Sequence, residues 1–178
     1  MRIAKVETLI SCGTYARSMH WRKTRKVIHD AVKMCCWPPG SGSFTIYPES
    51  GKKRGEGNGV GPIRDGFVSE LKDQDWVIEG KAKNALGQGL GDFDAVLGGP
   101  EGPIVVEWET GNISSSHRSM NKMAMLLTDG IIAAGTLVVP SRRLYVYLTD
   151  REETSRSLNR TSGCGSPYPV KTACSKLS

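Results

Sequence analysis

The sequence predicts an α/β fold, in which helices flank a mixed central β-sheet. Apolar residues recur at helical spacing in some segments and form strand-like runs in others, in the order helix, strands, helix, strands. The 178 residues suit one domain, because two separate cores of half that length would each be marginally stable. A hydrophobic fraction of 38% with 24% charged residues is too apolar for a disordered chain.

The first third of the chain predicts two helices separated by a strand and a loop. Ala16–Trp37 is expected to be a helix that stops at Pro38, and a second helix is expected to begin at Pro62. Between them, Phe44–Tyr47 is expected to be a short strand. The glycine-rich, basic stretch 49–61 lacks the residue order of a phosphate-binding loop, so a solvated loop is expected. The second helix should turn three apolar residues inward, namely Ile63, Phe67 and Leu71.

The remainder predicts the sheet and one more helix. The expected strands are Trp76–Lys81, Phe93–Leu97, Pro103–Glu109, Gly135–Val139 and Leu144–Leu148. The glycine-rich turn 98–102 joins the second and third of these as a hairpin. The helix is expected at Ser114–Asp129, with Met120, Ala124 and Leu127 facing inward.

Cysteine content, charge and hydropathy restrict the class of protein. The five cysteines are odd in number and contain no C-x-x-C pair, which argues against a zinc site and a disulfide framework. No segment approaches the ~18 apolar residues of a membrane span, and no signal peptide precedes the first helix. A soluble, cytoplasmic protein is therefore expected. The sequence pI near 9.1 favours polyanionic partners, although a net charge of +6 also fits ordinary enzymes.

The strand Pro103–Glu109 carries two acidic residues on one face. Side chains alternate along a strand, so Glu107 and Glu109 point the same way. Asp94, on the neighbouring hairpin strand, can reach the same edge, and Glu79 lies near the end of the strand before it. Carboxylates this close repel one another unless a cation lies between them, and Mg²⁺ prefers such oxygen ligands. A Mg²⁺ ion held by Asp94 and Glu107 would polarise a phosphodiester and lower the pKa of bound water.

The carboxylates, and the segment that follows them, each also have a purely structural explanation. The carboxylates can be surface groups paired with Lys81, Lys83 or Arg118. The segment that follows them carries Asn112, Ser114 and Arg118, which are residue types that read base edges in the DNA major groove. An Asn- and Ser-rich helix start is also ordinary N-capping.

The run EWETGNISSSHRSMNKM at residues 107–123 closely resembles the active-site strand and following helix of the BamHI-like type II restriction endonucleases. Further matches occur at GDFDAV (Gly91–Val96) and YLTDR (Tyr147–Arg151), and the similarity runs in order from about residue 27 to residue 151. The resemblance implies a restriction-endonuclease-like core. It also implies four catalytic carboxylates, Glu79, Asp94, Glu107 and Glu109, of which Glu109 stands where most relatives in the PD-(D/E)xK superfamily carry Lys.

The resemblance implies ligands and partners as well. The metal ligands would be Asp94, Glu107 and Glu79, and the cofactor Mg²⁺. The DNA-binding residues would be Asn112, Ser114, Arg118, Asp150 and Arg151. Enzymes of this family cut double-stranded DNA at the palindrome GGATCC as homodimers, and a cognate DNA methyltransferase is expected in the same restriction-modification system.

The family pattern is lost after Arg151. BamHI-like enzymes continue there with an aromatic, acidic segment and another strand, whereas residues 152–178 are rich in Ser and lack apolar periodicity. We expect residues 1–151 to form the domain, truncated at its C-terminal side, and residues 152–178 to be a disordered tail produced by a frameshift. Two other functions stay open: an inactive remnant that at most binds DNA, and a nuclease of different specificity such as a resolvase.

Overall fold

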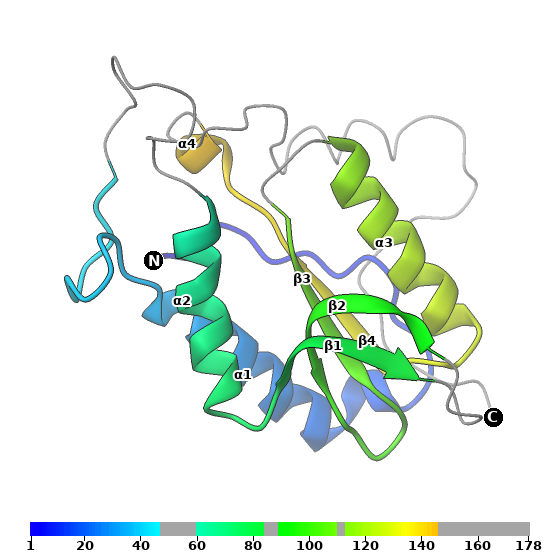
Figure 1. The fold of residues 1–178 in the computed structure, drawn as a ribbon. Coiled ribbons are helices and arrows are strands. Elements are labelled where there is room, and N and C mark those ends of the chain that lie inside the picture. Colours follow the sequence, from blue (N-terminus) through cyan, green and yellow to red (C-terminus); the bar gives the residue numbers. More distant parts are fainter. Residues whose placement is uncertain (47–59, 84–88, 110–112, 146–178) are drawn as a thin grey trace.

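The computed structural model describes residues 1–46, 60–83, 89–109 and 113–145 (Figure 1). Within these ranges a four-stranded sheet carries helices on both faces. In chain order the elements are η1 (Tyr15–Arg17), α1 (Met19–Met34), α2 (Val60–Lys72), β1 (Val77–Lys83), β2 (Gly89–Leu97), β3 (Ile104–Trp108), α3 (Ile113–Thr128), β4 (Ala134–Val138) and α4 (Arg142–Tyr145). None of the helices in the described ranges has the length and hydropathy needed to cross a membrane.

The sheet has the strand order β1-β2-β3-β4 and is mixed. β1 pairs with β2 and β2 with β3 in antiparallel fashion, as expected for strands joined by hairpins. β4 pairs with β3 in parallel, and α3 provides the crossover connection between them that parallel strands require. The arrangement confirms the predicted α/β fold with a mixed sheet and flanking helices.

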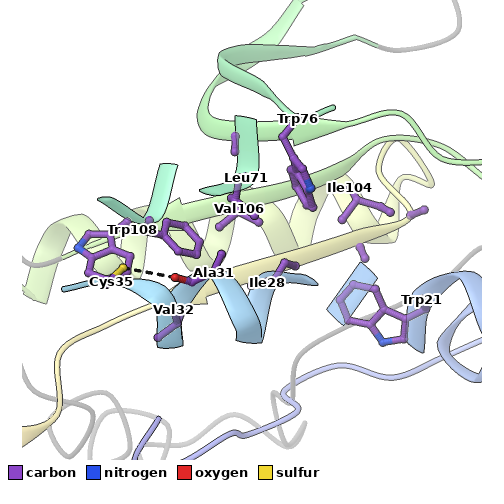
Figure 2. Packing of buried hydrophobic residues seen from close by; sticks show 14 of the residues in the cluster. Trp21, Ile28, Ala31, Val32, Cys35, Leu71, Trp76, Ile104, Val106 and Trp108 are labelled. Atoms are coloured by element: carbon purple, nitrogen blue, oxygen red, sulfur yellow. Dashed lines mark hydrogen bonds between the residues drawn. The ribbon is translucent and has the colours of Figure 1, made fainter. Parts of the chain in front are cut away.

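One face of the sheet packs against α1 and α2 (Figure 2). Side chains of α1, α2, β2, β3 and β4 form one buried cluster there, which includes Ile28, Ala31, Leu71, Val106 and Trp108. The predicted inner face of the second helix is confirmed, since Ile63, Phe67 and Leu71 are all buried. The helix α1 is shorter than the predicted Ala16–Trp37 at both ends: Ser18 caps its start, accepting a hydrogen bond from the Trp21 amide at 3.0 Å, and the helix ends at Met34.

The other face of the sheet packs against α3. The second buried cluster joins Phe93, Val96 and Val105 of the sheet to Met123, Leu126 and Leu127 of the α3 helix. Met120 and Ala124, which the sequence places inward, are only half-buried. The third residue predicted inward, Leu127, is buried, and two serines, Ser116 and Ser119, are buried on this helix as well.

Two predicted strands, Phe44–Tyr47 and Leu144–Leu148, are not strands in those of their residues that the structure describes. Phe44 forms a single bridge to Trp37, and Tyr47 lies outside the described residues. Leu144 belongs to the short helix α4, because its amide donates to the Ser141 carbonyl oxygen at 2.9 Å and closes a helical turn. Residues 146–148 and the predicted tail 152–178 lie outside the described residues.

Candidate active site

Asp94 and Glu107 meet where the ladder between β2 and β3 ends. The last recorded pair is Ala95 with Val106, and the two acidic residues follow at the next position. Asp94 Oδ2 accepts a hydrogen bond from the Trp108 backbone amide at 2.6 Å, so a carboxylate takes the place of a main-chain carbonyl. The two side chains are only 16% and 12% exposed. The expectation that Asp94 on β2 reaches the end of the sheet where Glu107 lies agrees with this arrangement.

Arg64 of α2 binds Asp94 from the other side. Its Nε and Nη2 atoms both donate to Asp94 Oδ1, at 2.9 and 2.5 Å. Nη2 also lies 3.6 Å from Oε1 of Glu79, which falls opposite Asp94 in the β1–β2 register. Burial lowers the pKa of the guanidinium, but the hydrogen bond and charge of Asp94 outweigh it and raise the pKa.

Glu79 differs from the other two carboxylates in exposure and in backbone conformation. Its side chain is 76% exposed. Its φ of 50° lies in the left-handed region, which a residue with a Cβ adopts at a cost of about 1 kcal/mol. Glu79 is therefore linked to Asp94 through Arg64 and stands at the solvent side of the group.

Lys122 of α3 pairs with Glu107. Its Nζ donates to Glu107 Oε1 at 3.0 Å and to the Asp92 carbonyl oxygen at 2.6 Å. Burial raises the pKa of Glu107, and the nearby charge of Asp94 adds to the increase, while Lys122 opposes it. Lys122 thus favours the ionised form of Glu107, whereas burial disfavours it.

Glu109 follows β3 and turns toward the same helix. The buried Ser119 donates a hydrogen bond from its Oγ to Glu109 Oε1 at 2.7 Å. Ser119 and Lys122 are three positions apart on α3, so they lie on one face of the helix. One helix face therefore holds both glutamates of the E-x-E pair.

The donor set fits a hard divalent cation at Asp94 and Glu107. Both are partly buried oxygen donors at adjacent positions of neighbouring strands, and oxygen donors are the ligands that such cations prefer. Within the described ranges, however, no three acidic, histidine or cysteine side chains gather closely enough to hold a metal ion together. Among the four carboxylates, Asp94 and Glu107 accordingly form a partly buried pair, and Glu79 and Glu109 flank this pair.

The surface-pair alternative named three cations, Lys81, Lys83 and Arg118, and the structure places the side chains of two of them. Lys81 lies 3.6 Å from Asp92, both of them exposed, and Arg118 is exposed on α3. The side chain of Lys83 lies outside the described residues. The cations that do pair with the site carboxylates are Arg64 and Lys122, which are partly buried.

Of the predicted DNA-binding residues, two fall within a described element. Ser114 and Arg118 are in the first half of α3, and the Arg118 side chain is exposed. The side chain of Ser114, and the residues Asn112, Asp150 and Arg151, lie outside the described residues. The helix that holds Glu107 and Glu109 is thus also the helix that carries Arg118.

Sequence reasoning did not single out Arg64, Ser119 or Lys122. The sequence contained a signal for two of them. Ser119 and Lys122 share a helix face with the apolar residues Met123 and Leu126, and a polar side chain on a buried face needs a hydrogen-bond partner. Arg64 gave no such signal, since it lies next to Asp65 on α2 and thirty positions from Asp94 in the chain.

Comparisons with known proteins identify the family of this chain. The family model described as restriction endonuclease BamHI matches residues 1–160, a wider span than the stretch 27–151 recognised from the sequence. The type II restriction enzyme OkrAI of Oceanobacter kriegii is 39% identical over 160 residues, covering 89% of this chain and 77% of that protein. The type II restriction enzyme BamHI of Bacillus amyloliquefaciens is 35% identical over 122 residues, covering 65% and 55% respectively. The chain belongs to the BamHI family of type II restriction endonucleases, which are site-specific deoxyribonucleases.

Proposed function

We propose that this chain hydrolyses phosphodiesters of double-stranded DNA at the palindrome GGATCC in a Mg²⁺-dependent reaction. The observation that carries the proposal is the Asp94–Glu107 pair, two half-buried carboxylates at the end of the β2–β3 ladder. Oxygen ligands select hard cations, and one divalent ion would balance both carboxylates together, whereas Arg64 and Lys122 each pair with one of them. We therefore assign the Asp94–Glu107 pair to metal binding in a nuclease.

Each carboxylate receives a role from its surroundings. Asp94 and Glu107 would hold the cation, and the exposed Glu79 would assist them from the solvent side. The bound metal supplies Lewis-acid polarisation of the phosphate and lowers the pKa of its water. Glu109 orients or deprotonates the attacking water: Ser119 holds its Oε1, and Oε2 remains to accept a proton.

Recognition would come from α3 and from the segment after β4. Asn112, Ser114 and Arg118 would read base edges in the major groove, and Asp150 with Arg151 would form a second reading pair. A palindrome calls for two-fold protein symmetry, so the active form would be a homodimer with one site for each strand. A cognate methyltransferase would protect the host DNA, and the protein would act in the cytoplasm. Residues 152–178 would take no part in the domain.

Plasmid DNA with one GGATCC site tests the proposal. Wild type should give linear plasmid with Mg²⁺ and none with EDTA, whereas Glu107→Ala should bind the DNA without cutting it. Asp73→Ala, which changes an exposed carboxylate in the turn after α2, is the matched control and should cut normally. Appreciable cleavage by Glu107→Ala would show that the metal site is assigned wrongly.

The same experiment addresses the remnant hypothesis. Intact plasmid in a retarded band, with wild type and Mg²⁺, would identify a protein that binds DNA without cutting it. A plasmid whose single site is changed at one base pair separates specific from general binding, because one wrong base pair costs about 1–3 kcal/mol.

A further inference from the structure

Lys122 is held in the site by three contacts, of which only one is to a carboxylate. Its Nζ lies 3.0 Å from Glu107 Oε1, 2.6 Å from the Asp92 carbonyl oxygen and 3.7 Å from the centre of the Phe93 ring. The ring face attracts the ammonium through its quadrupole. The contacts to Asp92 and Phe93 come from β2 and do not depend on Glu107, so they fix the ammonium beside that carboxylate.

The ammonium of Lys122 therefore lies beside Glu107 Oε1, an oxygen that would also bind the metal ion. An ammonium and a divalent cation are both attracted to the carboxylate. Two positive charges beside the same carboxylate also repel each other. Lys122 therefore stabilises Glu107 when no metal is bound and opposes the metal when it arrives.

We propose that Lys122 is a resident counter-ion of Glu107 which the divalent cation must displace, so that this lysine sets the metal affinity of the site. The inference rests on the proposed function, because it takes Asp94 and Glu107 as the metal ligands. The cation would take over the Glu107 oxygen alone, and the contacts of the ammonium to the Asp92 carbonyl oxygen and the Phe93 ring would remain. Lys122 is thus a positioning residue for Glu107.

Direct counting of bound metal in the absence of DNA tests this inference. Mn²⁺ serves as the probe, because electron paramagnetic resonance measures the free ion and gives the affinity by difference. Lys122→Met keeps an unbranched stem that packs on Phe93 and removes the charge. Lys122→Gln removes the charge and keeps a donor for the Asp92 carbonyl, so the pair remains informative if one variant folds poorly.

Both neutral variants should bind Mn²⁺ about tenfold more tightly than wild type, since competition and repulsion are both removed. In EDTA they should unfold at a lower temperature than wild type and gain more from added metal. Lys122→Arg should keep the weak binding of wild type. Lys26→Met, which alters an exposed lysine paired with Asp30 on α1, is the control and should leave the affinity unchanged. Adding Glu107→Gln to Lys122→Met should abolish the gain.

Equal Mn²⁺ affinities for wild type and both neutral variants would overturn the inference, as would a gain that survives Glu107→Gln. Absence of Mn²⁺ binding in wild type and both variants would also overturn it. Failure of the nuclease proposal is recognised separately by the plasmid assay. If wild type cuts DNA and the Mn²⁺ affinities are equal, only the role of Lys122 is lost. If the affinities differ as expected and no DNA is cut, Lys122 keeps its role and the nuclease proposal fails.

Discussion

Asp94 Oδ2 accepts a hydrogen bond from the Trp108 backbone amide at 2.6 Å. This bond anchors a β2 side chain to the main chain of β3, at the residue that directly follows Glu107. The position of Asp94 relative to Glu107 is therefore fixed by backbone geometry.

Substitutions of Asp94 should separate its structural role from its proposed chemical one. Asp94→Asn keeps an oxygen for the Trp108 amide, whereas Asp94→Ala leaves that amide without a partner, which costs about 1–3 kcal/mol. Both should cut DNA at least about a thousandfold more slowly, because a metal ligand is lost. Urea unfolding and plasmid cleavage measure the two effects. Wild-type cleavage by Asp94→Asn would remove Asp94 from the metal site.

Ser119→Ala should impair cleavage without weakening DNA binding. The buried hydroxyl donates to Glu109 Oε1 at 2.7 Å, and a hydrogen bond to a charged group contributes about 1.5–3 kcal/mol. We expect kcat to fall about tenfold or more with KM unchanged. Thr128→Ala, which removes a hydroxyl bonded only within α3 to the Ala124 carbonyl, is the control. A rise in KM at constant kcat would show that Ser119 acts on DNA binding instead.

Phe67→Ala should destabilise the whole domain. Phe67 is fully buried on α2, and its ring lies 4.9 Å from that of Trp108 on β3. Loss of a buried Phe side chain costs about 3–5 kcal/mol, from lost burial and from the cavity that remains. Met19→Ala, at an exposed position of α1, should change stability by less than about 0.5 kcal/mol. Denaturant unfolding gives both values, and equal losses would contradict the assigned core.

Cys35 and Cys36 should react with iodoacetamide at different pH. Burial raises the pKa of the Cys35 thiol to about 11, whereas a backbone hydrogen bond at Gly40 lowers the pKa of Cys36. Only the thiolate is reactive, so a raised pKa means less of the reactive form at any given pH. At pH 8 Cys36 should be alkylated first, and the Cys35 rate should keep rising until about pH 11. Mass spectrometry of the peptides gives both rates; faster reaction of Cys35 at pH 8 would contradict the burial assignment.

Part of this picture followed from local patterns in the sequence. Alternation along β3 determined that Val106 and Trp108 face one cluster while Glu107 faces away from it, because the side-chain period of a strand is two. The periodicity of α2 predicted its buried face correctly. On α3 the same reasoning placed Leu127 correctly, but buried Ser116 and Ser119 occupy positions that a hydropathy pattern assigns to solvent.

The sequence by itself determined the four strands that form the sheet, although it predicted two more, and it determined the acidic residues at the end of these strands and the family. Only the tertiary structure decided which cations meet those carboxylates. Arg64 reaches Asp94 across thirty residues, and Lys122 reaches Glu107 across fifteen. Such pairs depend on how α2 and α3 pack on opposite faces of the sheet, which apolar contacts distributed over the whole chain decide. A local pattern contains no information about that packing, so the charge balance of the site became visible only in the folded chain.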